Sequence, residues 1–202
     1  MSPIEAVVLD MGNVLAFHDD AVLFRRMAAW GGADPKTIHQ RVLALWDPIN
    51  RGILAGDDLR REVCRAAGGE SPMPIDEFSA LWSCHFRVHH EVLPLVDALL
   101  DQVKVLLLSN TNEMHWRYIR ARLPQFARFS ACVLSYELGL AKPAPEIYRV
   151  ALARAGAAPE HVAFFDDVPE FVDAARALGI AGRVFTDAPT FRTQLAELGV
   201  KV

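Results

Sequence analysis

Three apolar segments of the sequence each end in polar side chains that can bind a metal ion or a phosphoryl group. The segments are residues 6–9, followed by Asp10; residues 103–108, followed by Ser109 and Asn110; and residues 162–165, followed by Asp166 and Asp167. A carboxylate acts as a nucleophile or as a ligand of a hard cation. Hydroxyl and amide groups donate hydrogen bonds to phosphate oxygens. Ligands of open α/β sheets bind beyond the carboxyl ends of the strands, so these polar ends predict one binding site.

A lysine completes this set of groups. Lys142 lies on a loop that contains Pro143 and Pro145, between the second and third apolar segments. A carboxylate nucleophile, a phosphate and carboxylate metal ligands place several negative charges side by side. Phosphoryl transfer depends mostly on positioning and on neutralising such charge. The residues therefore predict a site for a divalent cation and a phosphoryl group, with Lys142 offsetting part of the negative charge.

Each of these residues also has a plainer structural explanation. An apolar run followed by Asp-x-Gly is how ordinary strands turn, Ser109 can cap a following helix, and a loop lysine is usually solvated. Asp166 and Asp167 are harder to explain in this way, because adjacent carboxylates repel each other unless a cation or hydrogen-bond donors lie nearby. A role for Asp166 in fixing Lys142 or the local turn stays open.

The chain resembles the haloacid dehalogenase-like superfamily, whose members are mostly phosphatases with an aspartate nucleophile. The resemblance covers nearly the whole chain, and four motifs carry it in the family's order. They are Asp-Met-Gly-Asn-Val at 10–14, Leu-Ser-Asn-Thr-Asn at 108–112, Lys-Pro-Ala-Pro at 142–145 and Phe-Phe-Asp-Asp at 164–167. The first and last motifs are similar to those of an Asp-x-Gly-Asn subgroup that includes bacterial phosphatases acting on α-glucose-1-phosphate.

The resemblance implies a role for each motif residue. A carboxylate would attack phosphorus to give an aspartyl-phosphate, which water then hydrolyses. The implied catalytic residues are Asp10 and Lys142, the implied Mg²⁺ ligands are Asp10, the backbone carbonyl of Gly12 and Asp167, and the implied phosphate-binding residues are Ser109, Asn110 and Lys142.

Two positions depart from the family pattern. Gly12 replaces the second aspartate of the first motif, the usual general acid and base, and such a group contributes about 10² to 10⁴ in rate. Phe171, next to Glu170, replaces a polar residue expected downstream of the last motif. Three functions therefore stay open: a phosphatase, a carbon–halogen hydrolase of the 2-haloacid dehalogenase type, and a catalytically silent protein that binds a phosphorylated ligand. Asp166 and Asp167 favour the phosphatase, because the dehalogenases work without a metal.

Three histidines are further candidates for site residues. His18, close to Asp19 and Asp20, is a candidate for the missing acid, although a role at a hinge or a helix cap explains it more simply. His85 and His89 are spaced i, i+4 on a segment expected to be helical. Such a pair can bind a metal, but a solvated helix face is the favoured explanation.

The apolar pattern predicts an α/β fold with a doubly wound parallel sheet, Rossmann-like as in the superfamily. Strands expected at 103–108, 131–134, 162–165 and 181–185 alternate with helices at 94–101, 112–122, 145–155, 169–178 and 189–198, and residues 6–9 add a further strand. Residues 16–91 show no strand alternation and predict four helices. We therefore expect a core of residues 1–15 and 92–202 with an inserted helical cap, 16–91. By analogy with the superfamily, this cap closes over the strand ends and favours a small phosphorylated metabolite as substrate.

Composition narrows the class of protein further. The chain has 202 residues, 52% of them hydrophobic, and a net charge of −4, which argues against a nucleic-acid partner. No apolar run is long enough to span a bilayer, so no membrane partner is expected. Three widely spaced cysteines, Cys64, Cys84 and Cys132, indicate reduced thiols and a cytoplasmic location.

Overall fold

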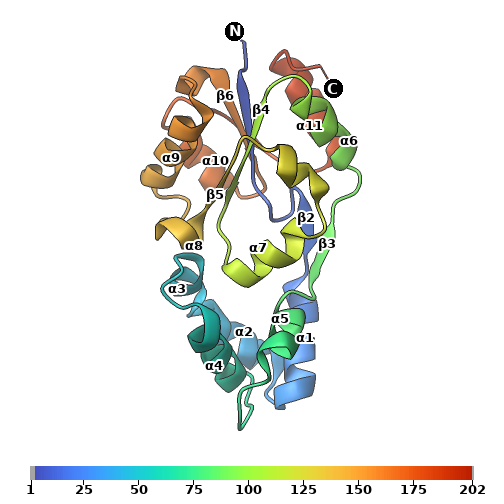
Figure 1. Ribbon diagram of the computed structural model, residues 1–202, viewed down its shortest axis with the longest axis vertical. Coiled ribbons are helices and arrows are strands. Elements are labelled where there is room, and N and C mark those ends of the chain that lie inside the picture. The colour runs from blue at the N-terminus through green and yellow to red at the C-terminus, as the bar shows by residue number, and fades with distance from the viewer. Residues whose placement is uncertain (1–2, 202) are drawn as a thin grey trace.

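A parallel sheet of five strands forms one end of the molecule, and a group of helices forms the other (Figure 1). The computed structural model describes residues 3–201. The strands are β1 (Ala6–Leu9), β4 (Lys104–Ser109), β5 (Ala131–Leu134), β6 (Val162–Asp166) and β7 (Ala181–Val184), in the order β5-β4-β1-β6-β7. β1 lies between β4 and β6, where the strand order reverses. The carboxyl ends of these three strands therefore meet at the switch point at which doubly wound sheets bind ligands.

The central strand is buried on both faces, as its unbroken apolar sequence predicts. Val7 and Leu9 pack with α6 (Leu93–Leu100), α7 (Glu113–Arg120) and α11 (Ala188–Glu197). Ala6 and Val8 pack on the other side, with α9 (Pro145–Ala155) and α10 (Pro169–Arg176). Shorter helical segments complete the connections: η1 (Pro124–Arg128), α8 (Ser135–Leu138) and η2 (Pro159–His161). This two-sided packing holds the strand ends in a fixed register.

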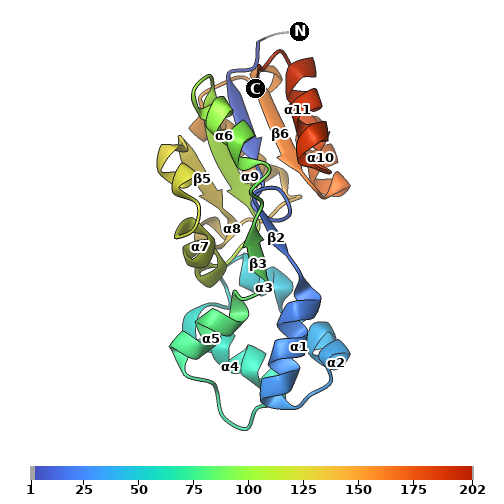
Figure 2. The same cartoon turned by 90° about the vertical axis from the view of Figure 1, so that its right-hand side faces the viewer.

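The helical group packs around an apolar cluster of its own. Its helices are α1 (Asp20–Gly31), α2 (Pro35–Leu43), α3 (Trp46–Asn50), α4 (Gly56–Ala66) and α5 (Ile75–Trp82). Phe78 and Trp82 lie in this cluster, which is separate from the clusters that cover the sheet. Two short antiparallel strands, β2 (Ala16–His18) and β3 (Phe86–Val88), join the group to the sheet (Figure 2). The chain termini lie at the far end of the molecule from these helices (Figure 1).

The structure confirms the predicted α/β fold, while the inserted segment differs in detail. It holds five helices rather than four, because α2 ends at Leu43 and a separate short helix, α3, begins at Trp46. The side chain of Asp34 caps α2, whereas α4 begins at Gly56 without a side-chain cap. Strands β2 and β3 were missed, because three residues are too few to show alternation. The boundaries at residues 15 and 92 stay predictions.

Among residues 3–201, the helices are too short or too polar to cross a membrane. The three cysteines are free thiols.

Candidate active site

Lys142 lies at the centre of a group of charges at the strand ends. Its Nζ donates to Asp10 Oδ1 at 2.7 Å and to Asp166 Oδ2 at 2.6 Å, and it reaches the carbonyl of Leu108 at 3.2 Å. Asp10 directly follows β1, Asp166 ends β6 and Leu108 belongs to β4, and the lysine side chain is 1% exposed. Lys142 is therefore buried, and its interpretation as a solvated loop lysine is wrong. Asp166 also accepts from the backbone N–H of Val168 at 2.9 Å, so it fixes both Lys142 and the local turn.

Burial dominates the electrostatics of this group. It raises the pKa of the Asp10 carboxyl to about 7, because the opposing effect of Lys142 is smaller and Asp166 adds to the shift. Burial alone lowers the pKa of the Lys142 ammonium, but Asp10 and Asp166 outweigh it and the net pKa is raised. The lysine therefore stays charged, and the Asp10 carboxylate lacks part of the positive charge that its ionised form needs.

A third carboxylate makes the group suitable for a divalent cation. Asp10, Asp166 and Asp167 each offer an oxygen atom, and these atoms lie within 4.8 Å of one another. With all three ionised and one ammonium beside them, two negative charges remain, which one divalent cation neutralises. Carboxylate oxygens are the ligands that Mg²⁺ prefers. We call Asp10, Lys142, Asp166 and Asp167 the strand-end cluster.

Asn13 connects the first motif to this cluster. It has a positive φ of 54°, a left-handed conformation that asparagine tolerates better than most residues. In the turn after β1, its amide Nδ2 donates to Asp167 Oδ2 at 2.7 Å and lies 3.3 Å from His18 Nε2. The residue thus orients a predicted metal ligand and a histidine together.

The end of β4 supplies the polar groups expected from the second motif. The buried Ser109 lines the cavity described below, and Asn112 rather than Ser109 caps α7, which removes the capping explanation. The Asn110 side chain bonds both backbone groups of Lys142, at 2.9 and 2.8 Å. Asn110 therefore positions the lysine, and its predicted contact with phosphate stays a prediction.

A cavity of about 640 Å³ opens over the strand-end cluster, between the sheet and the helical group. Asp10, Asn110 and Lys142 line its floor, and helices α1, α2 and α3 contribute the opposite wall. The polar residues on this wall are Asp20, His39, Asp47 and Asn50. The helical group thus lines a space above the predicted phosphate site, and its role as a cap stays a prediction.

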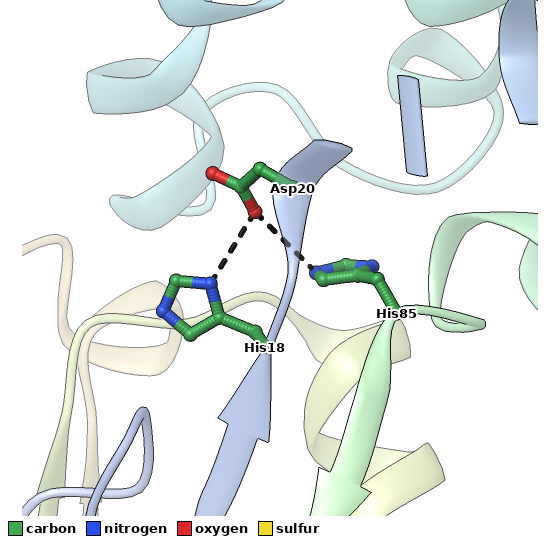
Figure 3. A group of neighbouring side chains, drawn as sticks. All are labelled: His18, Asp20 and His85. Atoms are coloured by element: carbon green, nitrogen blue, oxygen red, sulfur yellow. Dashed lines mark hydrogen bonds and ion pairs between the residues drawn. The ribbon is translucent and has the colours of Figure 1, made fainter. Parts of the chain in front are cut away.

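His18 borders the space that the missing second aspartate would occupy. A Cβ atom added to Gly12 would lie 3.5 Å from both Asp10 Oδ2 and the His18 ring. The His18 Nδ1 lies 3.3 Å from Asp20 Oδ1 (Figure 3). This hydrogen bond raises the pKa of His18 and lowers that of Asp20. Asp19 rather than Asp20 caps α1, so the Asp20 side chain is not needed as a helix cap. Both His18 and Asp20 line the cavity.

The expected helical pair of His85 and His89 is wrong. Helix α5 ends at Trp82, and β3 lies between the two histidines. His85 faces Asp20, whereas His89 bonds the carbonyl of Val14 at 3.0 Å and lies outside the cavity lining. Burial lowers the pKa of His85 to about 4. Sequence reasoning missed His85 and Asp20 as a pair because 65 positions separate them.

Phe171 lies beside the lysine rather than leaving a gap. Its ring centroid is 5.1 Å from Lys142 Nζ, and its backbone carbonyl accepts from Tyr148 Oη at 2.8 Å. The face of an aromatic ring attracts a cation at this distance. The residue that replaces the expected polar side chain therefore supports Lys142.

Residues 4–179 match the family model described as haloacid dehalogenase-like hydrolase. The chain belongs to this family. The match confirms the resemblance drawn from the four motifs and identifies the protein as a hydrolase, while the Asp-x-Gly-Asn subgroup stays a prediction.

Curated and solved relatives of this hydrolase span most of its length. A D-ribitol-5-phosphate phosphatase from Bacteroides thetaiotaomicron is 28% identical over 191 residues, which cover 87% of this chain and 89% of the relative. A HAD family enzyme of the same organism, solved in complex with magnesium and inorganic phosphate, is 25% identical with a TM-score of 0.80, covering 91% and 93% of the two chains. A 2-haloacid dehalogenase from Pseudomonas syringae shares only the fold, with a TM-score of 0.66 at 18% identity over 96% and 99%.

Proposed function

We propose that this hydrolase is a Mg²⁺-dependent phosphatase that hydrolyses a small phosphorylated metabolite through an aspartyl-phosphate on Asp10. The observation that carries the proposal is the strand-end cluster, in which three carboxylates lie close to one ammonium at the floor of a cavity. The relatives support it, since one is named a phosphatase and another holds magnesium and phosphate.

Asp10 has one oxygen available for attack. Lys142 occupies Oδ1, while Oδ2 lies on the side of Gly12 and His18, towards the cavity. Oδ2 attacks phosphorus, and the bond between phosphorus and the leaving oxygen breaks. Water then attacks the aspartyl-phosphate, which releases inorganic phosphate and restores the Asp10 carboxylate.

The residues proposed to hold Mg²⁺ are Asp10, the backbone carbonyl of Gly12 and Asp167. The ion supplies positive charge that neutralises the phosphoryl oxygens and screens them from the nucleophile. Ser109 and Lys142 line the same space; Ser109 contributes a hydrogen bond to the phosphoryl group, and Lys142 contributes its positive charge.

His18 is our candidate for proton transfer to the leaving oxygen. Its Nε2 lies 3.3 Å from Asn13 Nδ2 and 3.6 Å from where a Cβ atom on Gly12 would lie, and Asp20 holds Nδ1. A carboxylate on one ring nitrogen orients the imidazole and stabilises its charged form, as in other Asp–His pairs. The ring therefore stands where the carboxylic acid absent at Gly12 would act.

The two alternative functions, a carbon–halogen hydrolase and a silent binding protein, each leave part of the strand-end cluster without a role. A carbon–halogen hydrolase needs a carboxylate nucleophile but no carboxylate metal ligands, which leaves Asp167 unexplained. A silent binding protein does not require the accessible Oδ2 of Asp10.

One assay separates the three functions. We expect the protein to hydrolyse p-nitrophenyl phosphate with Mg²⁺, to lose this activity in EDTA, and to regain it with excess Mg²⁺. Release of chloride from 2-chloropropionate in EDTA would instead identify a dehalogenase. Binding of inorganic phosphate, measured by calorimetry, without any turnover of the ester would identify a silent relative.

A further inference from the structure

Two polar residues on the cap side of the cavity face each other without bonding. His85 Nε2 lies 3.9 Å from Asp20 Oδ1, which is too long for a hydrogen bond (Figure 3). The His85 side chain is 1% exposed, and among residues 3–201 its Nδ1 has no hydrogen-bond partner. We call Asp20 and His85 the cap-side pair.

The environment of His85 decides which ring nitrogen carries its proton. Because burial lowers its pKa to about 4, the ring is neutral at pH 7 and has a single N–H group. A buried N–H without an acceptor costs more than a bare nitrogen, so the proton belongs on Nε2 rather than on Nδ1. His85 therefore presents a donor to the cavity, and Asp20 presents an acceptor next to it.

The spacing of this donor and acceptor fits one hydroxyl group. A hydroxyl oxygen accepts one hydrogen bond and donates another, and two such bonds of ordinary length place their partners about 4 to 4.6 Å apart. The 3.9 Å separation of Nε2 and Oδ1 lies just below this range.

We infer that the cap-side pair binds a hydroxyl group of the substrate, so that the substrate is a polyhydroxylated compound with a single phosphate. This inference rests on the proposed phosphatase function, because the phosphate group occupies the floor of the same cavity. His18 bonds both Asn13 and Asp20, which places the hydroxyl site one imidazole ring away from the first motif.

Charge on the cavity wall excludes a second anionic group. Lys142 is the only lysine or arginine among the described lining residues, and Asp10 and Asp166 already neutralise it. On the cap side, Asp47 is paired with Arg51 at 2.7 Å, whereas no lysine or arginine is paired with Asp20 among the ion pairs of the described residues. A second phosphate or a carboxylate near Asp20 would meet this carboxylate without a permanent cation, whereas a hydroxyl group can donate to it.

Asn50 offers a further partner for such a substrate. It is buried and lines the cavity, and its side chain makes no hydrogen bond to another part of the described chain. Its amide can both donate and accept.

A transition-metal site is the main competing explanation. His18, Asp20 and His85 offer ligand atoms within 4.8 Å of one another. A histidine that binds a metal normally donates its other N–H to a carboxylate or carbonyl. The unpartnered Nδ1 of His85 lacks this support, which favours the hydroxyl group.

The test compares substrates with and without hydroxyl groups. D-ribitol 5-phosphate and n-pentyl phosphate are both primary phosphate esters on five-carbon chains. We expect the parent to prefer the first by roughly 100-fold in kcat/KM, since a site built to bond a hydroxyl rejects analogues that lack it. His85→Phe, which keeps a ring but no N–H, should lower this preference by at least about 10-fold. Hydrolysis of p-nitrophenyl phosphate, which has no hydroxyl group, should change little.

Two further variants separate recognition from packing. His85→Gln restores a side-chain N–H and should recover part of the preference. His90→Phe changes an exposed histidine that does not line this cavity, and it should leave the preference unchanged. Equal parental rates on the two esters would overturn the inference, as would a His85→Phe variant that slows all three substrates equally. Zinc binding in excess Mg²⁺ that is lost in His85→Phe would establish the metal site instead.

A binding measurement keeps this inference distinct from the proposed function. If the parent hydrolyses no ester, the phosphatase proposal fails. Calorimetry with the Asp10→Asn variant then still tests the cap-side pair, because tighter binding of ribitol phosphate than of pentyl phosphate, weakened by His85→Phe, supports it. Equal binding of the two compounds overturns it.

Discussion

The strand-end cluster and the cap-side pair use similar residue types in opposite ways. In the cluster, Lys142 bonds two carboxylates at under 3 Å, and these carboxylates lie at the ends of the neighbouring strands β1 and β6. In the cap-side pair, His85 and Asp20 stand 3.9 Å apart on segments that flank the two short connecting strands. Groups that stabilise developing charge work best when the fold holds them in place beforehand. Groups that recognise a ligand must keep hydrogen bonds free for it. The contrast is therefore the one we expect if the cluster carries the reaction and the pair binds the substrate.

The sharpest way to break this contrast is Asp10→Asn. The variant keeps the shape of the side chain but removes the nucleophile, so we expect kcat to fall by at least about 10⁴-fold. The loss should be the same for every phosphate ester, unlike the selective effect of His85→Phe. Single-turnover assays with p-nitrophenyl phosphate and ribitol phosphate measure it. Hydrolysis at the parental rate would contradict the covalent mechanism.

His18 lies between the two regions, and His18→Gln tests its assignment to proton transfer. We expect a loss of about 10² to 10⁴ in kcat/KM for alkyl phosphates, whose leaving groups need a proton. Aryl phosphates, acyl phosphates and sugar-1-phosphates should lose far less. The measurement is a plot of log kcat/KM against leaving-group pKa, which should be steeper for the variant. Parallel plots would assign the proton to another group. Gly12→Asp is a less clean test, because its side chain would meet the His18 ring.

Lys142→Met tests whether the cluster is held together by charge. Methionine leaves Asp10 and Asp166 as adjacent buried carboxylates, so we expect a loss of about 3 to 5 kcal/mol in the free energy of unfolding at pH 7. The loss should shrink at lower pH, where the carboxylates take up protons. Urea denaturation at several pH values measures it. Lys36→Met, on an exposed helix surface, is the control and should stay within about 0.5 kcal/mol. Equal losses of unfolding free energy in Lys142→Met and Lys36→Met would mean that charge does not hold the cluster together.

Asp167→Ala and Asp166→Ala divide the cluster into metal ligand and lysine partner. We expect Asp167→Ala to raise the half-saturating Mg²⁺ concentration by at least about 10-fold. This factor is at the lower end of the losses in metal affinity that follow changes at metal sites. Asp166→Ala should change it less, because this residue bonds Lys142 and Val168 instead. Calorimetric titration with Mg²⁺ and the Mg²⁺ dependence of activity both report the midpoint. Equal midpoints would remove the assignment of Asp167.

The smallest effect concerns the pH dependence of the pair formed by His18 and Asp20. The pKa of His18 is raised by the bond to Asp20, so its contribution to stability is present below pH 6.5 and lost as pH rises through the folded value. The pKa of Asp20 is lowered, so its contribution is present above pH 3.8 and lost at lower pH. Asp20→Asn should therefore destabilise the protein most between these values. Imidazole titration by NMR should show His18 above 6.5 in the parent and lower in the variant. An unchanged midpoint would mean that Asp20 does not act on the ring.

Much of the core followed from local sequence. The run Ala6–Leu9 predicted a strand buried on both faces, and the expected strands and helices from residue 93 onward lie within about two residues of those observed. The four motifs predicted which residues gather at the strand ends. They did so because the carboxyl ends of neighbouring parallel strands share one edge of the sheet.

The amino-acid sequence thus determined the sheet, the order of its motifs and the residue types of the strand-end cluster, since these depend on apolar runs and on the residues directly after them. Only the tertiary structure decided that Lys142 is buried between two carboxylates, that β2 and β3 pair, and that His85 faces Asp20. The physical reason is that short strands and unbonded polar pairs have no local pattern. They form where packing brings together residues that lie far apart along the chain.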